Sequence, residues 1–506
     1  MNIQYNSTIY QKFKRLGKGT YSSVFSYRNF KDQKRIAVKK YVSRDYNGIS
    51  FDMIKELSIL KYVNSDFLIK ILDIDYNDFN YSIMPEYKFT LYQFYKTYVL
   101  HEKIISQIFY DICYGVYHMH SKGIIHRDLK SHNILVHKTS ESFKIIIIDA
   151  GLSRVYDDTS MTPQMVTLYY RAPELLIGKN KYNFSIDMWS LGCILSELFN
   201  KNLLFHADSE IDLMIKQFKL LGTPHDDPFF KDYISKFPKY QKIIHEKYKH
   251  IDKCALHLMT NLLKLNPKER YTITDALNHE FLNEIYVFPD PEYNRSKFLK
   301  NYTYEYCFRD RISKSVNFEM RRILLDWILA IGHQYKQNLQ VFFLTVSILD
   351  RFLCKADPKN ITMDKFQLIG AACLWIASKL HSVKILLMEN LYILGTIHER
   401  NLIEMEKVIL RTLDFNLITP ILPNYLTIFN LDKGEKDNIL NNCIISVYYK
   451  SYLEYSPYEF IKSLYNANRD LFDDVTDYFE ECYDHFYRDD DKYKFTKKYI
   501  RQKLYN

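Results

Sequence analysis

The chain has 506 residues, a length that suggests about three domains. With 47% hydrophobic and 25% charged residues, it has the composition of packed globular proteins, which excludes a disordered or collagen-like chain. The net charge of +9 comes from 69 basic and 60 acidic residues spread along the sequence, and without a basic tract we expect neither a nucleic-acid nor a membrane partner. Eight cysteines without a C-x-x-C pair favour an intracellular protein with reduced thiols, in the cytoplasm, the nucleus or both.

The first half of the sequence predicts strands followed by helices. Residues 13–42 alternate like short strands around a glycine turn, and residues 50–63 carry apolar side chains at helical spacing. A helix is expected at 101–120, a strand pair near 134–148 and mostly helices from 184 to 282. This order predicts a small sheet-rich lobe before a larger helical lobe.

A polar stretch that contains prolines, at 287–297, marks a domain boundary. From residue 318 onward, broad apolar faces recur at the 3.6-residue period and are joined by short polar turns. We therefore expect an all-α bundle in the second half of the chain.

Two segments of the strand-rich part indicate a phosphate site. LGKGTYSSV at 16–24 places Gly17 and Gly19 in a turn between strands, where a bare backbone can approach phosphate oxygens, although plain turn chemistry is the alternative. Lys39 follows on a strand, and Glu56 lies in the next amphipathic helix, so the two side chains can form an ion pair. A surface lysine on a strand is the other interpretation of Lys39.

The most specific motif is HRDLKSHNIL at 126–135. Within one loop it supplies Asp128 to accept a hydroxyl proton, Lys130 to steady a transferring phosphoryl group and Asn133 to hold a metal ion. Asp149 follows an apolar strand, where a carboxylate would bind the Mg²⁺ that bridges ATP phosphates. The motifs therefore predict phosphoryl transfer with ATP and Mg²⁺ as cofactors.

These motifs, with RAPELL at 171–176, resemble a eukaryotic protein kinase. LFHADSEIDLMIKQFKLLGTP at 204–224 and VTLYYRAPELL at 166–176 resemble segments of cyclin-dependent kinases in particular. The resemblance covers residues 1–288 and implies a bilobal α+β protein-kinase fold. It also assigns three further residues to the nucleotide site: Val24, Ala37 and Met84.

The resemblance implies two structural roles and one departure. Glu174 is expected to form a buried ion pair with Arg270, and Asp187 is expected to brace the catalytic loop. Ala150 stands where the family has the phenylalanine of its Asp-Phe-Gly motif, and its small side chain would weaken the coupling between the regulatory helix and the active site.

The family's regulatory positions are also matched. Thr162 corresponds to the activation-loop threonine, whose phosphate would be received by Arg127, Arg154 and Lys55. The family has an arginine at the third position, so Lys55 forfeits bidentate geometry. Thr20 and Tyr21 match inhibitory phosphorylation sites of the family, with loop packing as the alternative. Three further residues match those that favour proline after the phosphoacceptor, which implies protein substrates with Ser/Thr-Pro sites: Met165, Val166 and Arg171.

The helical half resembles a cyclin. Four segments carry the likeness to a cyclin box at 318–418: MRRILLDW, ILDRFL, FQLIGAACLWIASKL and MEKVILRTLDF. Lys379 and Glu406 match the residues that contact the kinase's regulatory helix and the loop before it, and we expect Arg321 and Asp326 to pair because buried charges need partners. Five residues match the family's substrate-docking patch, although Ala330 replaces its acidic residue: Met320, Ile323, Leu324, Trp327 and Gln367.

The remaining parts of the second half are less informative. Residues 289–317 are expected to form a linker and an N-terminal helix, so that an all-α cyclin-like helical domain follows the kinase fold. Residues 419–506 begin like a second cyclin fold and then lose the pattern, and FEECYDHFYRDDDKYK is expected to be a solvated charged helix and turn.

Together these expectations describe a proline-directed protein serine/threonine kinase that is activated in cis by its own fused cyclin-like domain. Two alternatives stay open. One is a non-catalytic pseudokinase that captures a separate kinase or cyclin, and the other is an active kinase that uses a separate cyclin while its helical half recruits substrates.

Overall fold

A computed structural model of the chain separates into two compact units, which are described one at a time. The first unit comprises Met1–Tyr41, Val63–Asp75 and Tyr81–Arg295, and the second comprises Val42–Tyr62, Tyr76–Asn80 and Ser296–Asn506. The structure describes these residues: 2–19, 22–42, 48–75, 78, 80–138, 143–156, 167–235, 237–283, 295–302, 316–382, 384–392, 397–429, 431–448 and 456–467.

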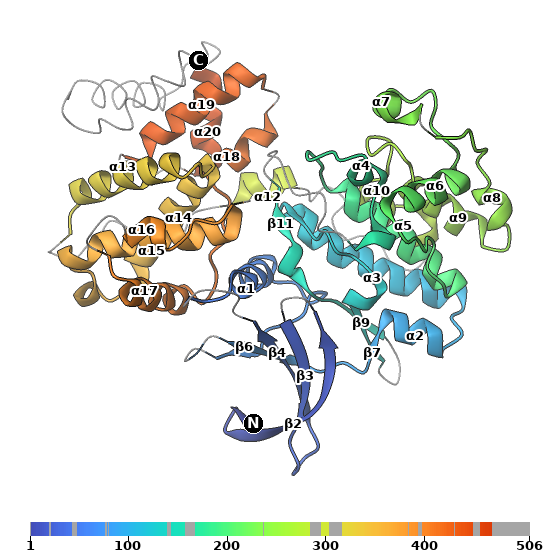
Figure 1. The fold of residues 1–506 in the computed structure, drawn as a ribbon, viewed down its shortest axis with the longest axis horizontal. Coiled ribbons are helices and arrows are strands. Elements are labelled where there is room, and N and C mark those ends of the chain that lie inside the picture. Colours follow the sequence, from blue (N-terminus) through green and yellow to red (C-terminus); the bar gives the residue numbers. More distant parts are fainter. Residues whose placement is uncertain are drawn as a thin grey trace. The chain divides into compact units, whose positions relative to one another are not determined.

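The first unit begins with a six-stranded antiparallel sheet in the order β1-β2-β3-β4-β6-β5 (Figure 1). β1 was not expected from the sequence. It forms a hairpin with β2 through Asn6 and Ser7, whose φ angles of 45° and 58° suit a tight two-residue turn even though neither residue is glycine. The strands have these bounds: β1 Asn2–Tyr5, β2 Thr8–Lys18, β3 Ser22–Arg28, β4 Arg35–Tyr41, β5 Asp73–Ile74 and β6 Tyr81–Pro85.

The rest of the first unit is mainly helical, as expected. Its core surrounds the fully buried Trp189 of α5, and α5 packs so closely on α9 that a Cβ at Gly192 would lie 2.8 Å from the Leu263 side chain. The predicted strand pair is present as β9 and β10, to which β7 adds a third strand. The main elements are α2 Leu91–Thr97, α3 Glu102–Ser121, β7 Phe89–Thr90, β9 Ile134–Lys138, β10 Phe143–Ile147, α5 Ser185–Asn200, α6 Glu210–Leu221, α9 Lys253–Leu262 and α10 Ile273–Leu277.

The described part of the second unit is helical throughout. α15 is its central helix, because every residue from Ile369 to His381 is buried. A Cβ at Gly370 would lie 2.6 Å from Leu324, so glycine permits α13 to approach α15 closely. The α-helices are α1 Phe51–Val63, of which all but the last residue belongs here, α12 Arg295–Asn301, of which all but the first residue belongs here, α13 Phe318–Gln334, α14 Leu339–Lys355, α15 Met363–His381, α16 Glu389–Tyr392, α17 Glu399–Thr412, α18 Leu422–Tyr425, α19 Lys433–Ser446 and α20 Pro457–Ala467.

One predicted ion pair in this unit is wrong. The Arg321 guanidinium takes Asp350 of α14 as its partner, with Nε to Oδ1 and Nη2 to Oδ2 distances of 2.7 Å each, and Nη1 donates to the Val447 carbonyl at 2.7 Å. Asp326 lies five residues along the same helix, a spacing that turns it well away from Arg321. Arg321 therefore joins α13, α14 and the end of α19 instead of bracing a single helix.

We predict that Asp350→Ala lowers the free energy of unfolding by about 3–5 kcal/mol, because it leaves the buried Arg321 guanidinium without its counter-charge. Urea denaturation followed by circular dichroism measures this loss. Asp326→Ala is the matched control, and an equal loss in that variant would contradict the assignment of Asp350 as the partner.

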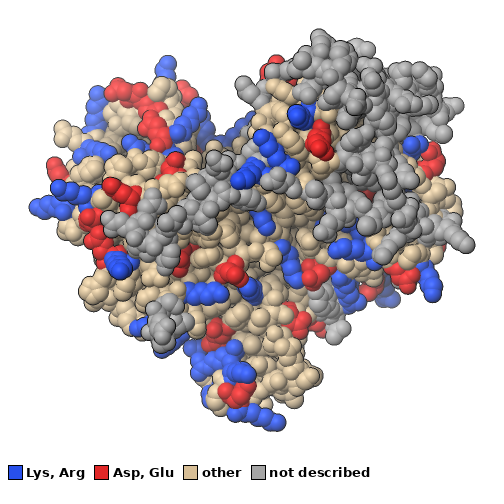
Figure 2. Space-filling model, turned by 180° about the vertical axis from the view of Figure 1, so that it is seen from behind, with Lys and Arg blue, Asp and Glu red and all other residues tan. Residues whose placement is uncertain are grey.

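On the face shown in Figure 2, basic and acidic side chains are intermixed over the described surface. None of the helices in the described ranges has the length and apolar character that crossing a membrane would require.

Candidate active site

The side chains assigned to the nucleotide share one face of the first unit's sheet. Ala37 and Lys39 are two residues apart on β4, so they point to the same side. In the antiparallel register Met84 of β6 lies opposite Ala37, and Val24 of β3 lies opposite Lys39. Ala37 and Met84 are each only 6% exposed. The four predicted residues therefore form one apolar surface with a single ammonium group.

The glycine segment lies at the end of β2, next to that face. Gly17 is opposite Val24, and the Gly19 N–H donates to the Ser22 carbonyl at 2.9 Å. A Cβ at Gly17 would have no atom within 4 Å, so the space beside this backbone is open to a ligand. Thr20 and Tyr21 lie outside the described residues.

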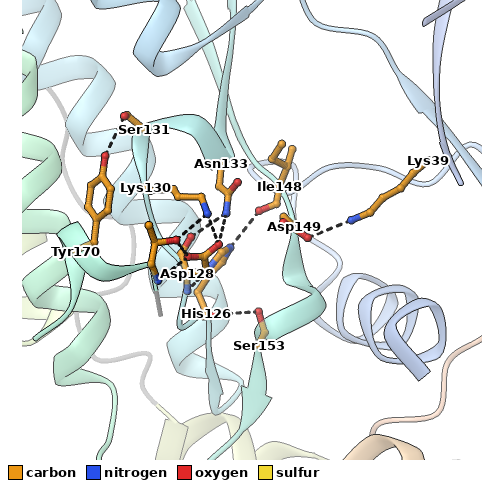
Figure 3. A network of polar contacts seen from close by, with 11 residues as sticks. Lys39, His126, Asp128, Lys130, Ser131, Asn133, Ile148, Asp149, Ser153 and Tyr170 are labelled. Atoms are coloured by element: carbon orange, nitrogen blue, oxygen red, sulfur yellow. Dashed lines mark hydrogen bonds and ion pairs between the residues drawn. The ribbon is translucent and has the colours of Figure 1, made fainter. Parts of the chain in front are cut away.

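The catalytic-loop residues converge on the Asp128 carboxylate (Figure 3). Oδ2 accepts from Lys130 Nζ at 2.6 Å and from Asn133 Nδ2 at 3.0 Å, while Oδ1 accepts from Thr167 Oγ1 at 2.6 Å. Lys130 Nζ also donates to Thr167 Oγ1 at 2.9 Å. Asp128 is 4% exposed, so a substrate hydroxyl that replaces Thr167 at Oδ1 would meet an oriented base. Thr167 was not assigned to the site from the sequence.

The predicted brace of this loop is confirmed. The buried Asp187 carboxylate of α5 accepts from the backbone N–H groups of His126 and Arg127 at 2.8 and 2.9 Å, and His120 Nε2 lies 2.9 Å from it. These bonds hold Arg127 at a φ of 70°, in the left-handed region. Burial raises the pKa of Asp187, but hydrogen bonding and charge from His120 and His126 hold it below its ordinary value.

The predicted pair of Glu174 and Arg270 is also present. Arg270 Nη1 and Nη2 donate to the two Glu174 oxygens at 2.8 and 3.1 Å, and both side chains are buried. This bidentate ion pair joins the segment after the active site, which contains Glu174, to the C-terminal part of the helical lobe, which contains Arg270.

Asp149 faces Lys39, whose Nζ lies 3.1 Å from its Oδ1 (Figure 3). Burial raises the pKa of Asp149, but the charge and hydrogen bond of Lys39 outweigh it and hold the carboxyl ionised. Asn133 donates to Asp128 through Nδ2, which leaves its amide oxygen for a ligand. An ionised carboxylate and an amide oxygen suit Mg²⁺, which keeps several waters and ligands from the phosphates. The neighbouring Ala150 is 2% exposed.

The structure describes only some of the predicted regulatory residues. Arg127 Nε donates to the Leu152 carbonyl at 2.6 Å and Nη1 to the Tyr182 hydroxyl at 3.1 Å, and Arg154 of β11 (Arg154–Val155) is buried in the same unit. Lys55 lies on α1 in the second unit. Thr162, Met165 and Val166 lie outside the described residues, so the phosphate cluster and the proline preference stay predictions.

In the second unit, Lys379 and Glu406 contact the segment before α1 and also pair with each other. Lys379 Nζ lies 2.6 Å from Glu406 Oε1 and donates to the Ile49 carbonyl at 3.0 Å, while the Ile49 N–H donates to Glu406 Oε2 at 3.1 Å. Lys379 also lies 3.5 Å from the centre of the Trp375 ring. A Cβ at Gly48 would lie 2.5 Å from Trp375, so the Trp375 ring packs directly against the backbone of a residue without a side chain.

Two contacts at the other end of α1 were not predicted. Lys61 Nζ lies 2.6 Å from Asp414 Oδ2, just after α17, and the Tyr62 ring packs edge-on against Phe298 of α12 at 6.2 Å. The pattern of charges and rings in the sequence gives no hint of these pairs, because they join segments more than 200 residues apart. The second unit therefore holds both ends of α1. Glu56 is buried on this helix, and its ion pair with Lys39 of the first unit stays a prediction.

The predicted substrate-docking residues divide between surface and core. Ile323 is 62% exposed, whereas Leu324 is 5% exposed and packs against Gly370. Met320, Trp327 and Gln367 are half-buried. Leu324 therefore serves the contact between α13 and α15.

Comparison with protein-family models agrees with both units. Residues 10–282 match the protein kinase domain, and residues 292–418 match the cyclin N-terminal domain. The first match covers more than half of the 506 residues, so the chain belongs to the protein kinase family. It is a protein kinase of bilobal fold that is continuous with a helical cyclin-like domain.

Proposed function

We propose that this chain is a protein serine/threonine kinase of the cyclin-dependent type, directed to Ser/Thr-Pro sites and activated in cis by its own cyclin-like unit. The observation that carries this proposal is that α1, with Glu56, is grouped with the cyclin-like helices and contacts them at both ends. Kinases are active when the glutamate of this helix reaches the lysine of the sheet, here Lys39. A unit that holds α1 is therefore placed to control the ion pair.

The geometry around Asp128 supports phosphoryl transfer to a hydroxyl. Asp128 accepts the proton as the hydroxyl oxygen bonds to the γ-phosphorus of ATP and the bond to the leaving ADP oxygen breaks. Lys130, which lies 2.6 Å from Asp128, would contact the transferring group, and Lys39 would contact the α- and β-phosphates. Asn133 and Asp149 would hold Mg²⁺, which would neutralise charge on the phosphates.

The preference for proline after the phosphoacceptor is supported by sequence positions and by two contacts of Arg171. Arg171 pairs with Glu210 of α6, and its carbonyl accepts from the buried Gln217 at 2.9 Å. These bonds fix the segment that follows Thr167, where the resemblance assigns the pocket for the next substrate residue.

The test is transfer of labelled phosphate from ATP to peptides by the intact chain without an added cyclin. We expect phosphorylation of a Ser-Pro peptide to exceed that of the matched Ser-Ala peptide roughly tenfold or more in kcat/KM. A tyrosine peptide should not be labelled. Transfer to neither serine peptide, even with Thr162 phosphorylated, would contradict the proposal and favour the binding module that captures a separate kinase or cyclin.

A further inference from the structure

Two arginines face each other at the end of the first unit's sheet where β3 turns into β4. Arg28 of β3 and Arg35 of β4 are direct partners in the antiparallel register. Like charges placed directly opposite each other on neighbouring strands are destabilising. The pair is therefore favourable only if neighbouring groups or a bound anion compensate for the repulsion.

One aromatic ring contacts both guanidinium groups. Phe13 of β2 lies at a register shift, so it has no partner residue on β3. The centre of its ring is 5.6 Å from the Arg28 guanidinium carbon and 5.1 Å from that of Arg35. The Phe30 ring, in the turn after β3, lies 5.7 Å from the same atom of Arg28. These cation–π contacts orient the two positive groups at one place on the sheet.

A single carboxylate serves this pair of arginines. Glu86, which follows β6, lies 3.8 Å from Arg35 Nη1 through its Oε1, and its Oε2 accepts from the Ser26 hydroxyl. Arg28 is half-buried and has no ion pair in the part of the chain that the structure describes, and its buried Nε has no hydrogen-bond partner there. One of the two guanidinium groups therefore lacks a counter-charge.

The surroundings of the pair are basic and apolar. Phe13 and Phe30 are 48% and 59% exposed. Between residues 9 and 35 the chain carries a single acidic side chain, Asp32, which pairs with Lys34 at 3.3 Å. The basic residues of this stretch are Lys12, Lys14, Arg15, Lys18, Arg28, Lys31, Lys34 and Arg35. An anionic partner that also carries apolar side chains would complement this surface.

We propose that Arg28 and Arg35, with Phe13 and Phe30, form a docking surface for an acidic segment of a partner protein. A carboxylate of that segment would accept from both guanidinium groups and relieve their repulsion, while its apolar side chains would pack on the exposed rings. Single-stranded nucleic acid is less suited, because its bases need free ring faces for stacking and guanidinium groups already occupy faces of these rings. The inference does not depend on phosphoryl transfer, because peptide binding is measured without it.

Fluorescence polarisation of a labelled Glu-Glu-Leu-Glu-Glu peptide with the intact chain tests the proposal. A saturating, non-hydrolysable ATP analogue with Mg²⁺ keeps the nucleotide site occupied, so that the peptide does not bind there. We expect the matched Gln-Gln-Leu-Gln-Gln peptide to bind roughly tenfold more weakly or less, because it lacks the charged acceptors. Added salt should weaken binding of the acidic peptide.

Substitutions locate the binding on this surface. Arg28→Gln combined with Arg35→Gln should lower the affinity roughly tenfold or more, since it removes both guanidinium donors. Lys239→Gln combined with Lys249→Gln is the matched control, which removes two exposed charges from the helical lobe and should leave the affinity unchanged. Phe13→Leu keeps every charge but removes the ring that contacts both arginines, so the affinity should fall about 2- to 5-fold.

Three outcomes would overturn the proposal. The first is equal affinity of the unmodified chain and the double arginine variant for the acidic peptide. The second is equal affinity of the unmodified chain for the acidic and the glutamine peptides. The third is tighter binding of a labelled single-stranded oligouridine than of the acidic peptide, which would indicate a surface for nucleic acid.

Discussion

Replacing Asp128 by asparagine is expected to lower kcat roughly 10²- to 10⁴-fold, the contribution of a positioned general base. The amide keeps the size of the side chain but cannot take the proton of the substrate hydroxyl. Lys39 and Asp149 lie on other elements, so ATP binding should persist. Labelled-phosphate transfer measures kcat, and the thermal shift caused by ATP reports binding.

Asp226→Asn is the matched control for this experiment, since Asp226 is exposed and belongs to the segment after α6, not to the catalytic loop. Its activity should equal that of the unmodified chain. Unchanged kcat in Asp128→Asn would remove Asp128 from the role of base and with it the catalytic interpretation of the HRDLKSHN motif.

Replacing Lys379 by alanine is expected to abolish most of the activity while leaving every catalytic side chain intact. Glu406 is 0% exposed and would lose its counter-charge, and the Ile49 carbonyl would lose its donor. Breaking a buried pair in this way costs about 3–5 kcal/mol. If this free energy is lost from the contacts that keep α1 in its active position, the population of active molecules and kcat fall roughly 10²-fold or more. Peptide phosphorylation measures the loss.

A compensating pair of substitutions controls for simple unfolding. Gly48→Ala adds a methyl group that would lie 2.5 Å from the Trp375 ring, so it should lower activity without removing any charge. Adding Trp375→Phe shortens the ring system and should restore much of that loss. Full activity of Lys379→Ala, or no rescue in the double variant, would contradict control of the kinase by this contact.

The sequence predicted best what lies in continuous motifs. Asp128, Lys130 and Asn133 are separated by a few residues in one loop, so their convergence follows from local spacing. The shared face of Val24 and Met84 follows from strand pairing once the sheet is recognised.

Features that depend on the tertiary fold could not be predicted in the same way. Arg321 pairs with Asp350 on another helix, because burial and helix packing select the partner that sequence proximity does not. The fit of Gly48 to Trp375 and the hydrogen bond from Tyr95 to Glu197 join residues far apart in the chain. Without the fold, each of these residues is typical of an ordinary helix, strand or turn.

We propose that one chain supplies both the kinase and its activator, and the dependence of specific activity on protein concentration separates this arrangement from activation by a second chain. A tethered activator has an effective concentration of order millimolar, which dilution of the protein does not change. We expect constant phosphate transfer per molecule across a dilution series, with no stimulation by an added cyclin. Activity that falls on dilution would indicate exchange of units between two chains, and a requirement for an added cyclin would contradict activation in cis.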